Sequence, residues 1–287
     1  MKIIRFLLFS LFLMLNSIVY AQFFDRDNPS LDFSAAAGIA SYYGDLAQNH
    51  SFFREPSYCL STGIAYNHNP HLTLRTDFSF LQVQAHDSKN TRADLKARNL
   101  SFISQMWDLN ATFEYNVLDI TGDQHKITPY AFIGFGVCHF NPYTKDRNGK
   151  TVYLQPMGTE GQGLAAYPDR KPYATTILQV PMGFGVKYAM SEKISFGLEL
   201  KYRYIDTDYL DDVSNAGYPD PAILAAKDPN LHILTYRADE LPGGNSYTKS
   251  NVTGLNRGNP NNRDAYYSLQ FKVLVKLKNF EHVDINY

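Results

Sequence analysis

The sequence has only two cysteines, a nearly balanced charge and, after its first residues, no long apolar run. Cys59 and Cys138 allow at most one disulfide bond, and they fall on predicted strands that are not neighbours, so we expect two small interior residues instead. No later segment reaches the ~20 apolar residues of a spanning helix, so membrane residence requires strands. Lysines and arginines are scattered around a formal net charge of -1, which excludes a basic stripe for nucleic acid.

The N-terminus has the pattern of a secretory signal peptide. Basic Lys2 and Arg5 precede an apolar run that is too short for a spanning helix, and small residues lead to Ala21. We therefore predict cleavage after Ala21, with residues 1–21 removed rather than kept as an anchor. The residue directly after the cleavage position is Gln22 and not a cysteine, which argues against a lipoprotein. Residues 22–287 are expected to form one domain, because no Pro/Ser-rich linker divides them.

Alternation with a period of two residues dominates the rest of the chain. Over 176–188 and 194–204, every second residue is apolar or aromatic, and the residues between them are small, polar or charged. This pattern suits the lipid face and polar interior of a membrane barrel. The sequence predicts an all-β fold, an eight-stranded antiparallel transmembrane up-and-down β-barrel with long extracellular loops. The predicted strands are 31–43, 58–66, 72–83, 100–115, 128–140, 176–188, 194–204 and 265–277.

A soluble barrel with its apolar face inward would produce the same periodicity. Eight strands enclose an interior only just wide enough for side chains. The residues of the other face are small or charged and suit such an interior, so we favour the membrane barrel. The many aromatic residues, 21 Tyr and 19 Phe, suit interfacial girdles. Pro181 cannot donate a ladder hydrogen bond, so a bulge is predicted there.

The lengths of the predicted connections indicate how the barrel is oriented in the membrane. Long polar segments such as 141–172 and 206–264 alternate with short turns. Barrels of the Gram-negative outer membrane have short periplasmic turns and longer surface loops. We therefore expect an outer-membrane location, with the long loops outside the cell and the tail 278–287 in the periplasm.

Charged side chains recur at positions that should face the interior. They could line an ion path, but buried charges must be paired, so a salt-bridged plug is the favoured interpretation. The predicted interior charges are Arg75, Asp77, Asp108, Glu114, Lys187, Glu199, Lys201, Arg203 and Lys272.

No catalytic or cofactor motif is present. The eight histidines are dispersed, no metal-ligand pair occurs at helical spacing, and no Ser/His/Asp arrangement stands out, so we predict no enzyme activity and no cofactor. The segment 206–212 carries carboxylates suited to a hard cation but lacks the glycine and distal glutamate of an EF-hand. A solvated acidic rim, or salt bridges to Arg170 or Lys171, is favoured over metal binding. The weak metal candidates are Asp206, Asp208, Asp211 and Asp212.

Several segments resemble the PorG-like outer-membrane β-barrel family of Bacteroidetes, a component family of the type IX secretion system. The more specific of them are TEGQGL and TDYLDDVS. The segments are 42–46 (YYGDL), 63–75 (GIAYNHNPHLTLR), 130–142 (YAFIGFGVCHFNP), 159–164 (TEGQGL), 179–188 (QVPMGFGVKY) and 207–214 (TDYLDDVS).

The resemblance implies a structural or assembly barrel that is associated with periplasmic secretion-ring proteins and supplies no catalytic residues. A barrel serving a periplasmic machine must present its partner surface at the turns, where both signs of charge occur. The predicted partner-binding residues are Asn67, His68, Asp119, Asp123, Glu192 and Lys193. The long loops keep an alternative open, a surface barrel for binding or small-solute transport.

Overall fold

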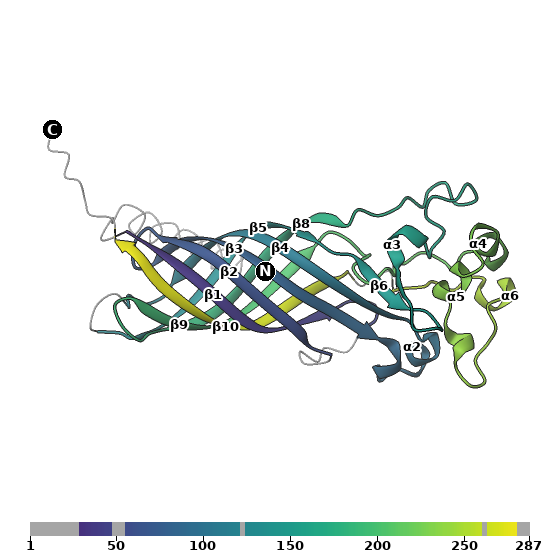
Figure 1. Cartoon of the computed structure of the whole chain (residues 1–287), viewed down its shortest axis with the longest axis horizontal. Helices are drawn as coiled ribbons and strands as arrows, with labels where there is room; N and C mark the ends of the chain where they lie inside the picture. The colour runs from purple at the N-terminus through teal and green to yellow at the C-terminus, as the bar shows by residue number, and fades with distance from the viewer. Residues whose placement is uncertain (1–28, 48–54, 121–123, 260–262, 280–287) are drawn as a thin grey trace, which may run out of the picture.

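Eight long antiparallel strands close into a barrel in the computed structural model, which describes residues 29–47, 55–120, 124–259 and 263–279 (Figure 1). Each strand pairs with the preceding one, and β1 pairs with β10 to complete the ring. The predicted fold class is therefore confirmed. The barrel strands are β1 (Ser30–Tyr43), β2 (Ser57–Asn67), β3 (Leu72–His86), β4 (Ser101–Asn116), β5 (Ile127–His139), β8 (Thr176–Ala189), β9 (Ile194–Ile205) and β10 (Ala265–Asn279).

The alternation along each strand separates an apolar exterior from a buried interior. Phe135 and Leu178 point outward and are 75% and 79% exposed, whereas Ser79 and Asp108 point inward and are fully buried. The predicted inward and outward sets agree with these burial patterns. Strands of 11 to 16 residues also meet the requirement of ~9–11 residues for a tilted membrane strand.

The predicted bulge at Pro181 is wrong. β8 keeps one continuous register with β9 through Pro181, which lies opposite Arg203. On the other side, the ladder with β5 is interrupted between the pairs Ile133–Met182 and Gly136–Gln179, and the register is the same on both sides of the gap. The proline has no N–H to donate, and missing ladder pairs at this point accommodate it without an extra residue.

The interior has two different halves. At the end of the barrel where β1 starts and β10 ends, the interior is filled by charged and amide side chains. Toward the other end it becomes an apolar core that includes Leu81, Phe102 and Ile205, so the expectation of a small or charged interior holds for only part of the barrel. Cys59 and Cys138 are free and buried in this core, as predicted.

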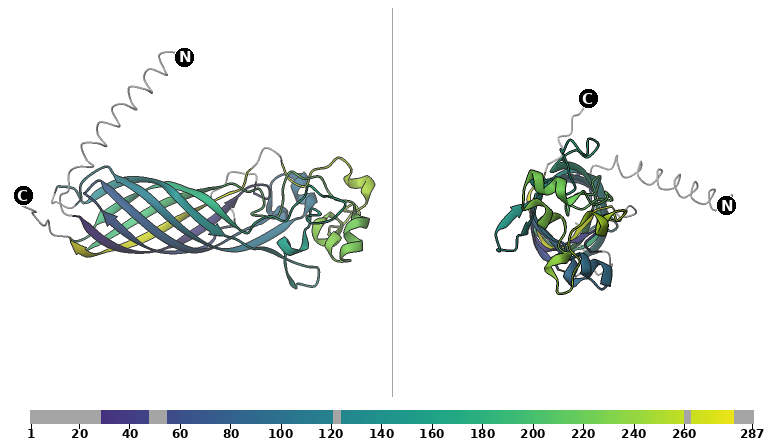
Figure 2. Two further views of the ribbon diagram at one scale, coloured as in Figure 1. Left: turned by 90° about the horizontal axis from the view of Figure 1, so that it is seen from above. Right: turned by 90° about the vertical axis from the view of Figure 1, so that its right-hand side faces the viewer.

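The connections after β3, β5 and β9 lie at one end of the barrel and contain short helices and strands (Figure 1). Viewed from that end, they lie across the mouth of the barrel (Figure 2). A hairpin in the β5–β8 connection extends the sheet from β4, because β6 pairs with β4 at Ile103 and Ser104. The short elements here are η1 (Asp87–Lys89), α2 (Ala93–Arg98), β6 (Pro142–Lys145), β7 (Thr151–Tyr153), α3 (Leu154–Met157), α4 (Pro221–Lys227), α5 (Leu231–Thr235), η2 (Ala238–Glu240) and α6 (Lys249–Val252).

Local sequence explains where two of these helices begin. Asp220 accepts a hydrogen bond from the N–H of Ala222 and is followed by Pro221, while Thr248 accepts from the N–H of Asn251. None of the helices in the described part of the chain has the length and hydropathy of a membrane-spanning helix.

Candidate functional site

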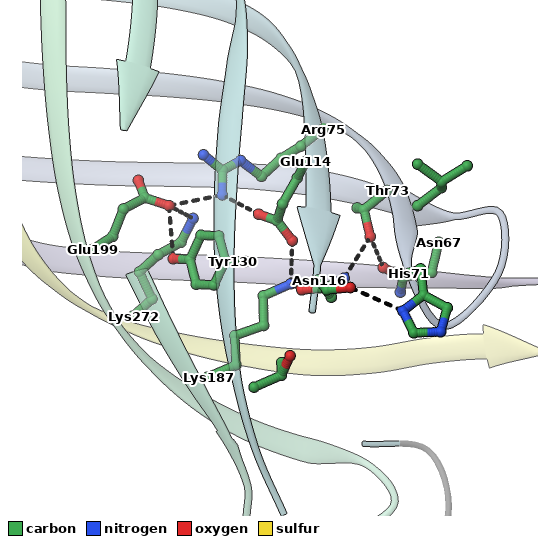
Figure 3. Close-up of polar contacts among 12 residues, drawn as sticks. Asn67, His71, Thr73, Arg75, Glu114, Asn116, Tyr130, Lys187, Glu199 and Lys272 are labelled. Atoms are coloured by element: carbon green, nitrogen blue, oxygen red, sulfur yellow. Dashed lines mark hydrogen bonds and ion pairs between the residues drawn. The ribbon is translucent and has the colours of Figure 1, made fainter. Parts of the chain in front are cut away.

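The structure brings the nine predicted interior charges into the barrel, all of them buried. Arg75 on β3 is the centre of the larger group (Figure 3). Its Nη1 lies 2.7 Å from both Glu114 on β4 and Glu199 on β9, and its Nε lies 2.7 Å from Asp77. One guanidinium therefore joins three carboxylates contributed by three strands.

Three lysines complete this group. Lys187 on β8 pairs with Glu114, Lys272 on β10 lies 3.1 Å from Glu199, and Lys201 on β9 lies 3.4 Å from Asp77. Because the partners come from both sides of the barrel, the ion pairs cross its interior. Removing one partner of a buried ion pair typically costs about 3–5 kcal/mol, since the other charge stays buried.

A second group lies closer to the apolar core. Arg203 on β9 pairs with Asp108 on β4 at 2.8 Å. The Tyr266 hydroxyl lies 3.1 Å from Asp108 and 2.6 Å from the side-chain oxygen of Gln179, whose amide donates to Asn110 at 2.6 Å. The two remaining predicted charges thus pair with each other and contact neutral polar groups, and the arrangement is suited to filling the barrel.

Aromatic and amide side chains that were not predicted also belong to these groups. The Tyr130 hydroxyl donates to Glu199 at 2.9 Å, and the Arg75 guanidinium lies 4.6 Å from the centre of the Phe132 ring. Asn116 accepts a hydrogen bond from Lys187 at 3.2 Å. All three occupy inward positions of the alternation, which was the available signal, but an aromatic residue at such a position does not by itself indicate a polar partner.

The predicted partner-binding residues are placed differently from one another. The Asn67 amide donates to Ser30 at 3.0 Å and accepts from Thr73 at 2.7 Å, so its polar atoms are already used inside the turn. His68 and Asp119 are half-buried, and Asp123 lies outside the described residues. Glu192 and Lys193 are exposed in the β8–β9 turn.

The four weak metal candidates do not face a common point. Asp206 is exposed and lies 3.1 Å from Arg263, Asp208 is half-buried, and Asp211 and Asp212 are buried. No group of three or more His, Cys, Asp or Glu residues positioned for a metal ion occurs in the part of the chain that the structure describes.

The expected acidic rim is also wrong for two of these residues. Asp211 is hydrogen bonded to Tyr42, and Asp212 accepts from Thr159 and from the Tyr173 hydroxyl at 2.8 Å. The expected partner Arg170 instead donates to the backbone carbonyls of Glu160 and Gly217, at 2.6 Å and 2.9 Å. Burial raises the pKa of both Asp208 and Asp212 to about 6. The end of β9 therefore leads into a folded structure, whose packing removes these carboxylates from water.

That structure joins the two most specific motifs of the sequence. Glu160 of TEGQGL accepts from the hydroxyl and the N–H of Ser214 of TDYLDDVS, at 2.6 Å and 2.8 Å. Arg257 is buried between the motifs. It donates to the Thr159 hydroxyl at 2.8 Å and lies 3.4 Å from an Asp212 carboxylate oxygen. We call the folded connections 87–100, 140–175 and 206–259 the loop cap.

The loop cap has its own apolar cluster. Leu224, Leu231 and Val252 are buried from three helices, and the Tyr247 ring stacks on Tyr236 with 5.0 Å between centroids. Sequence reasoning missed this cluster and Arg257, because neither follows a regular period. The cap thus presents a fixed surface at the mouth of the barrel.

The outer wall of the barrel carries a shallow apolar depression of about 690 Å³ over β4, β5, β8 and β9. Its lining includes the exposed rings of Phe113 and Phe184 and the small residues Ala131 and Gly183. This depression is part of the outward-facing apolar surface.

Comparisons with known proteins identify a family and several barrels of low similarity. No curated protein matches the chain. Neisserial surface protein A (NspA) is 13% identical, with 87% of this chain and 99% of that chain covered and a TM-score of 0.42. OprG from Pseudomonas aeruginosa is 9% identical, with 88% and 98% covered and a TM-score of 0.37, and Ail of Yersinia pestis is 7% identical, with 87% and 98% covered and a TM-score of 0.36.

A family match covers residues 5–220, which include seven of the eight barrel strands and the two motifs joined in the loop cap. Its description carries no activity, substrate or partner. Because the match spans most of the sequence, the chain belongs to the family described as Domain of unknown function (DUF6089).

Proposed function

We propose that this chain is a non-enzymatic outer-membrane β-barrel that serves as a structural or assembly component of a type IX protein secretion apparatus. The observation that carries the structural role is the filled interior. Four carboxylates and five cationic side chains are buried there in contact with one another, and an apolar core continues to the loop cap. A barrel filled in this way acts through its surfaces rather than through a pore.

The outer-membrane location is supported by the exterior of the barrel. Its wall exposes large apolar side chains, such as Leu60, Phe113 and Phe184, on strands long enough to cross a bilayer. In water, an apolar surface of this extent would drive aggregation. The signal-peptide pattern at the N-terminus is consistent with export to that membrane.

The type IX role is supported by the resemblance of the six segments, two of which form one packed unit around Arg257. For the partner, we propose a protein of the periplasmic secretion ring that contacts the short turns. Glu192 and Lys193 are the exposed charges of the β8–β9 turn, and an interface there would be polar and salt-sensitive.

Crosslinking in native membranes tests this proposal at three positions. Glu192→Cys reports on the turn, Phe184→Cys on the apolar wall and Leu255→Cys on the loop cap, where Leu255 is exposed. Cys59 and Cys138 are buried, so a bulky thiol-reactive crosslinker should select the introduced cysteine. Capture of a periplasmic secretion-ring protein from Glu192→Cys alone supports the proposal. Capture of such a protein from Phe184→Cys alone would show that the partner contacts the apolar wall and not the turn.

The second candidate function is a surface-binding barrel, and the folded loop cap is the observation that favours it. A cap with its own apolar cluster and capped helices gives a fixed outer surface, as a binding site needs. Crosslinking to an extracellular protein from Leu255→Cys, with no product from Glu192→Cys, would replace the secretion proposal by this one.

A further inference from the structure

A single tyrosine hydroxyl holds together both ends of the longest connection of the loop cap. Tyr42 lies near the end of β1 and points into the mouth of the barrel. Its hydroxyl oxygen is 2.6 Å from Oδ2 of Asp211, which follows β9, and 2.6 Å from Oδ1 of Asp264, which precedes β10. The 206–264 connection is therefore fastened at its two ends to the same atom.

The number of hydrogens at this atom determines the charge of the group. A phenol has one hydrogen, so Tyr42 donates to one carboxylate and must accept from the other carboxyl. The second carboxyl needs a proton of its own, because two bare oxygens would repel each other at 2.6 Å. Tyr42, Asp211 and Asp264 are 4%, 1% and 1% exposed, so water cannot compensate for a second negative charge.

Within 29–47, 55–120, 124–259 and 263–279, no cation is placed to replace this proton. Among the described residues, neither Asp211 nor Asp264 forms an ion pair. The remaining oxygens of the two carboxyls accept from the N–H groups of Val213 and Leu210, at 2.9 Å and 2.8 Å, which fixes their positions. The charged groups that interact with Asp211 or Asp264 from the adjoining elements are Asp45 after β1, Asp208 after β9 and Arg98 of α2. Arg263, before β10, interacts in turn with Asp208.

Both guanidiniums among these groups are engaged elsewhere. Arg98 binds Asp87 through two nitrogens, at 2.7 Å and 2.8 Å, and Arg263 lies 3.1 Å from Asp206. Burial and the neighbouring carboxylates raise the pKa of Asp211, and burial raises that of Asp264. The electrostatics thus agree with the hydrogen count.

We propose that Tyr42, Asp211 and Asp264 form a one-proton clasp that keeps the loop cap closed, and that loss of this proton at higher pH releases the 206–264 connection from the barrel mouth. The clasp itself holds one proton more in the closed form than in the open form. Its protonation therefore favours closing, and the clasp raises the ratio of open to closed protein by at most tenfold per pH unit, apart from the separate titration of Asp208 and Asp212. The clasp does not depend on the type IX proposal.

Asp264→Asn provides the matched variant. The asparagine amide can donate to the tyrosine oxygen while Tyr42 donates to Asp211, so the contacts remain but the titrating proton does not. Hydrogen exchange is measured on the full-length wild type and variant in detergent micelles between pH 5 and pH 9. The readout is the exchange rate of residues 206–214 in the wild type divided by that in the variant. We expect this ratio to rise with pH. The exposed Asp206→Asn serves as the control and should follow the wild type.

Infrared spectroscopy provides a readout that does not depend on motion. The wild type at neutral pH should show a protonated, buried carboxyl that Asp264→Asn and Asp211→Asn lack. A pH-independent exchange ratio, or absence of this carboxyl band, overturns the proposal. Opening of the wild-type connection by a chelator at neutral pH also overturns it, because a bound cation would then balance the carboxyls. If Asp264→Asn loses its barrel fold, the pH dependence of hydrogen exchange and the carboxyl band of the wild type still test the proposal.

Discussion

Glu199 is the most informative position for testing whether the barrel interior is a dry, paired network. Its carboxylate lies 2.7 Å from Arg75 and 3.1 Å from Lys272, and it accepts from Tyr130 at 2.9 Å. Glu199→Gln keeps the shape of the side chain but raises the excess of cations over anions in the group from one to two. The charges that remain are Arg75, Lys187, Lys201 and Lys272 against Asp77 and Glu114.

The expected destabilisation is about 3–5 kcal/mol, the usual cost of removing one partner from a buried ion pair. At a slope of about 2 kcal/mol per M urea, the unfolding midpoint should fall by about 2 M. The fluorescence of Trp107, the only tryptophan, can follow unfolding because its ring faces outward on β4. Exposed Glu192→Gln is the matched control and should change stability by less than about 0.5 kcal/mol. An equally small effect of Glu199→Gln would refute the paired network and favour a hydrated interior.

Three further predictions follow from the same structure. The unmutated barrel should give no stable large conductance in planar bilayers, and steady conductance would contradict a filled interior. Purified protein should migrate faster unheated than boiled on a gel and should fractionate with outer membranes, whereas recovery from the soluble periplasm would contradict the location. Because the pKa of Asp212 is raised to about 6, the folded cap binds more protons than the unfolded chain between pH 4 and pH 6. As the pH rises from 4 to 6, the free energy of unfolding of the cap should therefore fall by about 2–3 kcal/mol. Hydrogen exchange of residues 206–214 can measure this loss, and Asp212→Asn should remove it.

The barrel could be predicted from sequence because its determinants are local. A period of two places Leu178 outside and Gln179 inside whatever the rest of the chain does, and eight such strands leave few ways to close. The interior charges were found for the same reason. What alternation does not reveal is the identity of the partners, so the link from Arg75 to Glu199, 124 residues apart, required the barrel to be closed first.

The loop cap could not be predicted because its contacts follow no period. Arg257 is 98 residues from Thr159, and nothing in the sequence around either residue indicates the other. The acidic segment was misinterpreted as a solvated rim because Asp211 and Asp212 follow each other in sequence. In the structure, their side chains have different partners, Tyr42 and Tyr173, in different elements. A positive φ of 65° at Asp212 accompanies this change of direction, and that conformation is not evident from residue type alone.

The filled interior and the loop cap together limit where this protein can contact a partner or a ligand. A solute entering from outside would meet the buried contacts of Arg257 and the Tyr42 clasp, then the apolar core around Phe102, and then the ion pairs of Arg75. Opening such a path would break several buried polar contacts at once, each costing about 1–3 kcal/mol or more. A ligand binding at the cap could release the first layer but makes no contact with the ion pairs beneath the core. The turns, the apolar wall and the outer face of the cap are therefore the places where this barrel can meet a partner without unfolding.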